Sequence, residues 1–248
     1  MNVALVGTAY ERPEYLDLAV ASWQRAGVER LPVVVWNLDR SPRTPECAEI
    51  VSRLPTHVIL VEPRERVGVL AAPWRMGEYG FDTLGADYLI FAEDDVVVSS
   101  DALDYLLWAG EAYRDDSTVL AVNAFRNGRN DLHCESPNHV QKVAGFSPLA
   151  WATWADRWRD RLSPEWDFDY THRGWDWNIN RLMRERWETE EEGDARVFSP
   201  LSRVVSPCRS RSQHIGQQGG IHCTEAMFES TLSVVFEETY TSDGVFCE

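Results

Sequence analysis

An apolar run that ends in three acids constrains the fold of this chain more than any other feature. Residues 88–98 read Tyr-Leu-Ile-Phe-Ala-Glu-Asp-Asp-Val-Val-Val. A buried strand ending in Glu93, Asp94 and Asp95 would suffer mutual repulsion and desolvation unless a cation neutralised the acids. Such hard oxygen ligands suit Mn²⁺ or Mg²⁺, which keep open positions for substrate phosphates. The alternative is a strand that runs into a solvated acidic turn, with a serine capping the next helix.

The first half of the chain alternates apolar strands with helical segments. The predicted strands are 2–9, 31–38, 57–61 and 88–92, and the predicted helices are 13–26, 44–54, 73–84 and 101–114. Strands and helices that alternate at this spacing favour a three-layer, Rossmann-like α/β fold around a central, mostly parallel sheet. Ligands bind such sheets at the carboxyl ends of the strands, which is where the three acids fall.

The second half is richer in tryptophan. Short strands are predicted at 119–125 and 140–144, and seven of the eleven tryptophans lie between Trp151 and Trp187. The spacing of Trp151, Trp154 and Trp158 places them on one helical face, where a role in the core is the simplest interpretation. Trp175 and Trp177 flank Asp176, so an aromatic wall for a sugar ring competes there with a role in the core. No linker or repeat divides the chain, and we expect one domain over 1–248.

Composition excludes several classes of protein. The net charge of −16 disfavours a surface that follows nucleic-acid phosphates, because Lys and Arg supply that binding. No apolar run approaches the ~20 residues of a membrane-spanning helix, and no signal peptide is visible. Five scattered cysteines without a Cys-x-x-Cys pair fit free thiols in a reducing cytoplasm better than a disulfide framework or a zinc site.

Several segments, in this order, resemble the GT-A glycosyltransferases. The segments are Arg12 after the first strand, Asp39 after the second, Glu93-Asp94-Asp95, 119–125, 145–151, Trp175-Asp176-Trp177 and 200–203. More narrowly, the chain resembles the inverting α-mannosyl β-1,2-N-acetylglucosaminyltransferases of the Golgi, and family-2-like glycosyltransferases, from about residue 3 to 228. The resemblance implies a UDP-sugar donor and Mn²⁺, a nucleotide-sugar-binding half at 1–118 and an acceptor-binding half at 119–248.

The resemblance also implies roles for single residues. Asp95 would ligate the metal, Asp94 and Glu93 would contact the ribose or metal-bound water, Asp39 would accept the uracil N–H, and Arg12 would help to fix the nucleotide. Exposed salt bridges are the alternative for Arg12 and Asp39. Trp151, Trp175 and Trp177 are the expected acceptor-binding residues.

Inversion requires a base that takes the proton of the acceptor hydroxyl, and Asp176 is our candidate. The chain departs here from the family, which has two adjacent acids where this sequence has Asp176-Trp177. The alternative is that Asp176 only caps a helix running to Trp187. Asp167 and Asp169 are the next candidates for the base.

The glycine-rich segment 213–222 predicts a loop that closes over a diphosphate. His222, or else His214, is a candidate metal ligand or phosphate contact, and Arg203, just upstream with Arg209 and Arg211, would complement phosphate charge. The predicted function is therefore a metal-dependent hexosyl- or N-acetylhexosaminyltransferase with a glycan or protein acceptor. The alternatives are a sugar nucleotidyltransferase and a non-catalytic, metal-dependent carbohydrate-binding protein.

Overall fold

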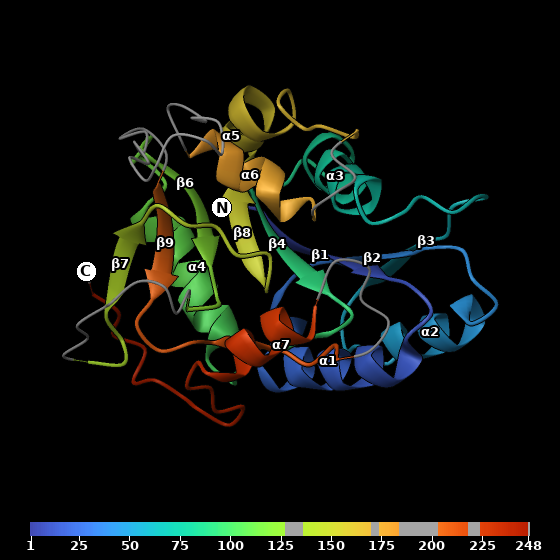
Figure 1. Cartoon of the computed structure of the whole chain (residues 1–248), viewed down its shortest axis with the longest axis horizontal. Helices are drawn as coiled ribbons and strands as arrows, with labels where there is room; N and C mark the ends of the chain where they lie inside the picture. The colour runs from blue at the N-terminus through green and yellow to red at the C-terminus, as the bar shows by residue number, and fades with distance from the viewer. Residues whose placement is uncertain (127–135, 170–173, 184–202, 218–223, 248) are drawn as a thin grey trace.

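A sheet of eight strands, in the order β3-β2-β1-β4-β8-β6-β9-β7, runs through the centre of the molecule (Figure 1). The computed structural model describes residues 1–126, 136–169, 174–183, 203–217 and 224–247. The strands of this sheet are β1 Val3–Ala9, β2 Val34–Leu38, β3 Val58–Val61, β4 Tyr88–Glu93, β6 Val119–Asn123, β7 Val140–Val143, β8 Trp151–Trp154 and β9 Arg203–Pro207. Only β7 and β8 run antiparallel to their neighbours, so the sheet is mostly parallel, as predicted.

Helices cover both faces of the sheet and complete a three-layer α/β fold (Figure 1). The helices are α1 Pro13–Arg25, α2 Thr44–Val51, α3 Ala71–Glu78, α4 Ala102–Ala112, α5 Ala155–Arg157, α6 Asp176–Leu182 and α7 Glu225–Leu232, with short helical turns at Val28–Arg30, Tyr79–Thr83 and Trp158–Leu162. Helices α1, α2 and α4 lie on one face, and α3, α5 and α6 lie on the other. Pro13 begins α1 because its fixed φ suits the first helical position.

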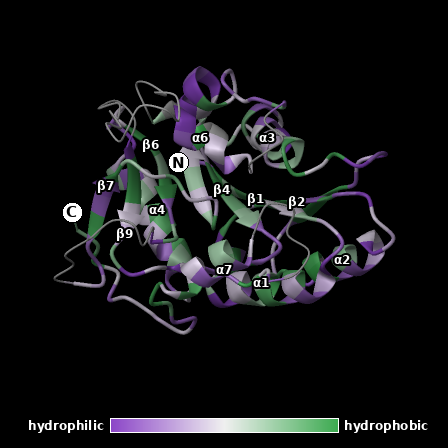
Figure 2. Cartoon of the chain, in the orientation of Figure 1, coloured by the Kyte–Doolittle hydropathy of each residue, from purple (hydrophilic) through white to green (hydrophobic). Residues whose placement is uncertain are grey.

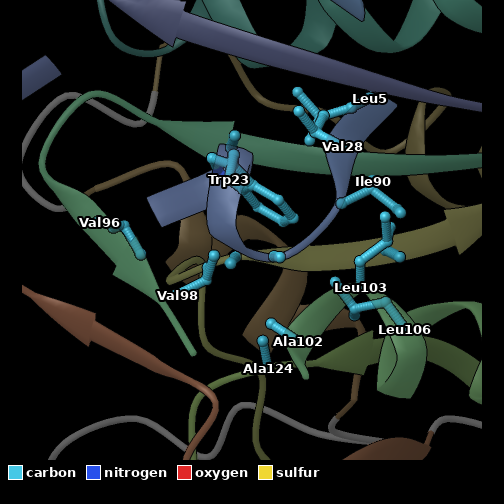
Figure 3. Close-up of a cluster of buried hydrophobic side chains, with 14 of the residues drawn as sticks. Leu5, Trp23, Val28, Ile90, Val96, Val98, Ala102, Leu103, Leu106 and Ala124 are labelled. Atoms are coloured by element: carbon cyan, nitrogen blue, oxygen red, sulfur yellow. The ribbon is translucent and has the colours of Figure 1, made fainter. Parts of the chain in front are cut away.

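Two apolar cores lie on either side of the sheet. Figure 3 shows part of the first, in which Leu5 and Ile90 of the sheet pack with Trp23 of α1 and Leu103 and Leu106 of α4. Strands β2 and β6 are buried along their whole length, as expected for strands covered on both faces. The hydropathy colouring follows this arrangement, because the central strands β1, β2 and β4 are mostly apolar whereas helices α1 and α2 mix polar and apolar residues (Figure 2).

The helical face predicted for Trp151, Trp154 and Trp158 is wrong, although all three side chains are buried. Residues 151–154 form strand β8, which pairs with β4 at Trp151↔Phe91. Trp151 and Trp158 belong to one core and Trp154 belongs to the other. A strand buried on both faces has apolar residues at every position, so a helix-like spacing arises without a helix.

A second, two-stranded sheet pairs β5 Val96–Val98 with β10 Ser212–His214 in antiparallel register, His214 opposite Val96. The sequence did not predict these strands. Cys208 is disulfide-bonded, which corrects the expectation of free thiols, whereas Cys47 and Cys247 are free. The cysteines therefore no longer favour a reducing compartment. Among the described residues, no helix is both long enough and apolar enough to cross a bilayer.

Candidate functional site

The three acids lie at the carboxyl end of β4, as predicted. Glu93 is the last residue of the strand, and Asp94 and Asp95 form the turn that leads into β5. Only 3% of Asp94 and 7% of Asp95 is exposed to solvent. The strand order places β1 directly beside β4, so the residues after β1 reach the same edge of the sheet.

Arg12 bridges the two aspartates. Its guanidinium donates to Asp95 Oδ2 at 2.7 Å and to Asp94 Oδ1 at 2.5 Å, while the backbone N–H of Tyr10 donates to Asp94 Oδ2 at 3.0 Å. Arg12 immediately precedes α1 and follows Glu11, which has a φ of 58°. A positive φ is strained for a side chain of this size, and such strain persists where the surroundings fix the backbone. The approach of Arg12 to the acids is thus built into the turn after β1.

The small sheet brings the C-terminal part of the chain to Asp95. His214 Nε2 lies 3.2 Å from Asp95 Oδ2, and the backbone N–H of Ile215 donates to the Asp95 carbonyl at 2.8 Å. A Cβ at Gly216 would lie only 2.3 Å from Asp95 Oδ2, so this position has room only for glycine. Of the two histidines predicted to reach the site, His214 does so, whereas His222 lies outside the described residues.

The acids differ in how readily they ionise. Burial, followed by the charges of Asp95, Asp94 and Asp176, raises the pKa of Glu93 well above its ordinary value. Burial and the charge of Asp95 raise the pKa of Asp94 to about 7, although Arg12 opposes the shift. Burial would also raise the pKa of Asp95, but the hydrogen bond with His214 and the charge of Arg12 outweigh it and lower that pKa. Asp95 is therefore the most readily ionised of the three.

Asp176, from the second half of the chain, lies near enough to Glu93 for their charges to interact. It is the first residue of α6, and its charge contributes to the raised pKa of Glu93. Burial raises the pKa of Asp176 itself to about 6, although the backbone amides of Asp176 and Trp177 lower it. A Cβ at Gly174 would lie 2.4 Å from Asp176 Oδ1, so the glycine leaves room for the carboxylate. The start of α6 thus places a partly buried acid of raised pKa beside the cluster.

Asp39 lies at the carboxyl end of β2 and is 5% exposed. Its carboxylate accepts hydrogen bonds from the backbone N–H groups of Arg40 at 2.9 Å, Val67 at 2.7 Å and Gly68 at 2.8 Å. The Asp39 side chain therefore holds the loop between β3 and α3. The exposed salt bridge predicted as its alternative is not formed within the described part of the chain, because the carboxylate is buried. A contact with a nucleobase stays a prediction.

The expected acceptor residues divide into core and surface. Trp151 is fully buried and stacks on Phe91 with ring centroids 4.1 Å apart, so it has no surface for an acceptor. Trp175 is 4% exposed and stacks on Trp166 with ring centroids 5.6 Å apart. The acceptor roles predicted for these two side chains are wrong, and the competing core interpretation holds. Trp177 is partly exposed and remains a candidate.

Arg203 is not brought to the acids. It begins β9 opposite Val119, and its backbone N–H donates to the Thr118 carbonyl. Since β9 and β6 run parallel to β4, Arg203 lies at the amino end of the strands, whereas the acids lie at the carboxyl end. Through the pairing of β6 with β8 and of β8 with β4, Val119 and hence Arg203 lie about level with Asp87. Asp87 precedes Glu93 by six residues, or roughly 20 Å along the strand. The spacing from 200 to 203 matched the family pattern, but it said nothing about which end of the sheet the arginine would occupy.

Sequence reasoning missed one aromatic group at the site. Tyr10 follows β1 directly, and the guanidinium of Arg66 lies over its ring, 4.2 Å from the centroid. Arg66 comes from the same β3–α3 loop that Asp39 holds. An aromatic residue at the carboxyl end of the first strand was the available signal for this group.

The acids fit a cation, but not as a closed protein cage. Four buried or partly buried carboxylates influence one another here, and burial together with the charges of neighbouring acids raises the pKa values of Glu93 and Asp94 even though Arg12 opposes the shifts. In the part of the chain that the structure describes, no three His, Cys, Asp or Glu side chains form a group that could hold a metal ion. Mg²⁺ and similar ions often use one or two carboxylates together with substrate phosphates, and this donor set suits that arrangement.

No protein-family model matches the sequence, and no curated protein matches it. Several solved structures share its fold. A mannosyltransferase from Pyrobaculum calidifontis, solved with GDP-Man and Mn²⁺, has a TM-score of 0.52 and 14% identity over 82% of this chain and 56% of that chain. TarS of S. aureus, residues 1–349 in complex with UDP, has a TM-score of 0.50 and 11% identity over 86% and 60%.

GalNAc-T7, solved with UDP, GalNAc and Mn²⁺, has a TM-score of 0.59 and 10% identity, over 94% of this chain and 47% of that chain. The chain thus spans between 47% and 60% of the length of these three structures. At such identities the similarity shows the fold alone. The fold is that of the GT-A glycosyltransferases, as the sequence predicted.

Proposed function

We propose that this GT-A fold carries a metal-dependent glycosyltransferase, which moves a sugar from a nucleoside diphosphate sugar to an acceptor hydroxyl. The observation that carries the proposal is the buried acid cluster at the carboxyl end of β4, with Asp95 held by both Arg12 and His214. Ligands of open α/β sheets bind at this edge. The solved structures of the same fold that hold GDP-Man or UDP with Mn²⁺ support the proposal.

Asp95 is the proposed protein ligand for Mn²⁺ or Mg²⁺, because it is the most readily ionised of the three acids. When bound, the ion would neutralise the leaving diphosphate. Arg12 and His214 both contact Asp95 Oδ2 and so set the direction of its carboxylate. Asp94 and Glu93 stay proposed contacts of the ribose or of metal-bound water.

Asp176 is the proposed general base of an inverting transfer. It lies beside the acid cluster, and its pKa of about 6 keeps it ionised at neutral pH while leaving it more basic than an ordinary aspartate. It would take the proton from the acceptor hydroxyl as that oxygen attacks the sugar. The partly exposed Trp177 beside it is the proposed acceptor contact.

The family resemblance favours UDP over other nucleotides, and a hexose or N-acetylhexosamine as the transferred sugar. Asp39 would support binding of this donor through the loop between β3 and α3 that its carboxylate holds in place. A direct contact between Asp39 and the base is also proposed. The acceptor class, a glycan or a protein, rests on the resemblance and on the acidic net charge, which disfavours nucleic acid.

Calorimetric titration of UDP and GDP, with and without Mn²⁺, tests the proposal. We expect one of the nucleotides to bind only with Mn²⁺, and Asp95→Asn to abolish this metal-dependent binding. Asp104→Asn is the matched control, since Asp104 also pairs with an arginine but on the exposed surface. Equal nucleotide affinity in Asp95→Asn and wild type would contradict the metal site. Glycan binding without any nucleotide would instead favour a carbohydrate-binding protein, and release of pyrophosphate from a nucleoside triphosphate and a sugar phosphate would favour a nucleotidyltransferase.

A further inference from the structure

Arg12 already occupies the position from which a cation would neutralise the acids. Its two terminal nitrogens reach Asp94 Oδ1 and Asp95 Oδ2, so one guanidinium spans both carboxylates. Only 22% of its side chain is exposed, and the carboxylates that it contacts are 5% and 10% exposed. A pair that is so well shielded from water is weakly screened by salt.

The backbone makes this arrangement specific. Arg12 precedes the first turn of α1, and its carbonyl accepts the first helical hydrogen bond from the Leu16 N–H at 3.1 Å. On the other side of the pair, Asp95 Oδ2 also faces His214 at 3.2 Å. The oxygen that a metal would use thus has two partners, and the nearer one is a permanent positive charge. A divalent ion that approached alone would be repelled by Arg12 and would have to displace it.

We propose that Arg12 is an internal counter-ion that keeps divalent metal from binding to the acids until a nucleoside diphosphate draws its guanidinium away. The inference rests on the proposed function. A diphosphate carries several negative charges, and the planar guanidinium matches phosphate oxygens with paired hydrogen bonds. Once Arg12 binds the diphosphate, its positive charge no longer neutralises the carboxylates, and a metal cation can take its place. Metal and nucleotide therefore enter as a pair.

This arrangement has a thermodynamic signature. If the nucleotide raises the affinity for the metal by some factor, the metal raises the affinity for the nucleotide by the same factor. Removing the charge at position 12 takes away the barrier to metal alone, and it also takes away part of the coupling. If Arg12 merely bound phosphate, its replacement would lower the affinity for nucleotide without raising the affinity for metal alone.

Titration of Mn²⁺, followed by the electron paramagnetic resonance signal of the free ion, tests the inference without an activity assay. The wild type, Arg12→Gln, Arg12→Lys and Arg43→Gln are each titrated with and without UDP, and GDP replaces UDP if only GDP binds. Arg43 is the control, because it pairs with two glutamates at the surface. We expect Arg12→Gln to bind Mn²⁺ alone about tenfold more tightly than wild type, and UDP to strengthen its Mn²⁺ binding less. Arg43→Gln should resemble wild type, and Arg12→Lys, which keeps the charge but cannot span both carboxylates, should fall between wild type and Arg12→Gln.

The outcomes separate this inference from the proposed function. If wild type binds Mn²⁺ with a nucleotide but Arg12→Gln binds Mn²⁺ alone no more tightly than wild type does, the counter-ion role is wrong and the proposed function stands. An equal gain in Arg43→Gln would show a general charge effect and would also overturn the inference. If no variant binds Mn²⁺ with either nucleotide, both proposals fail. Circular dichroism of each variant confirms that it is folded.

Discussion

Replacing Asp94 by asparagine should stabilise the metal-free protein, and more so at high pH. Burial and the charge of Asp95 raise the pKa of Asp94 from 3.8 to about 7 in the folded state. The folded protein therefore holds a proton that the unfolded chain has already released. Between about pH 4 and pH 7 this group makes the protein less stable as pH rises, and above that range the loss is constant.

The pKa difference sets the magnitude. Above pH 7 the full cost of ionising Asp94 is about 4 kcal/mol, and at pH 5.5 it is about 2 kcal/mol. Asparagine carries no charge, but its single oxygen cannot serve both Arg12 and the Tyr10 N–H, which costs about 1–3 kcal/mol at any pH. We therefore expect Asp94→Asn to raise the free energy of unfolding by about 1–3 kcal/mol at pH 8.

Urea denaturation with a chelator, followed by tryptophan fluorescence at pH 5.5 and pH 8, measures this effect. The difference in stability between Asp94→Asn and wild type should grow by about 2 kcal/mol from the lower pH to the higher. Asp104→Asn, at an exposed surface position, should show no such growth. The reasoning is refuted if the difference is the same at both pH values, or if Asp94→Asn is the less stable protein at pH 8.

Three further outcomes follow from the same structure. Asp176→Asn should keep donor affinity but slow transfer by about 10²-fold or more, and the wild-type rate should rise with pH through about 6, because only the ionised carboxylate accepts a proton; an unchanged rate would assign the base elsewhere. Gly216→Ala should abolish metal-dependent nucleotide binding in calorimetry and cost about 1–3 kcal/mol in urea, since its Cβ would overlap Asp95. Arg211→Met should cost about 3–5 kcal/mol in urea, because it leaves the buried Asp101 unpaired, and adding Asp101→Leu should recover part of that loss.

Periodicity predicted the first half of the fold well, because each strand there is a short apolar run followed by an amphipathic helix. It failed at β8, where burial on both faces removes the alternation that distinguishes a strand. It also missed β5 and β10, which are three residues each and are defined only by their pairing with one another. Pairing between such distant segments leaves no local pattern in a sequence.

The acid cluster could be predicted because three carboxylates after an apolar strand leave few alternatives. The different properties of the individual acids could not be predicted, since Asp94 and Asp95 have the same chemistry and differ only in their partners. Asp95 contacts His214, and the pKa of Asp95 is lowered. Asp94 instead accepts a hydrogen bond from a backbone amide, and its pKa is raised. Trp151 and Arg203 show the same limit, because residue type and order do not reveal on which face or at which end of a sheet a side chain lies.

The pairing of β5 with β10 has a consequence for how the protein folds. The contact between Asp95 and His214 closes a loop of 119 residues. Closing so long a loop costs about 4 kcal/mol of chain entropy, which the few hydrogen bonds between two three-residue strands offset only in part. We therefore expect the eight-stranded sheet to assemble first and to bring the two segments together. We expect the site to mature late in folding, with the acids at the end of β4 exposed to solvent until the chain beyond residue 212 docks against them.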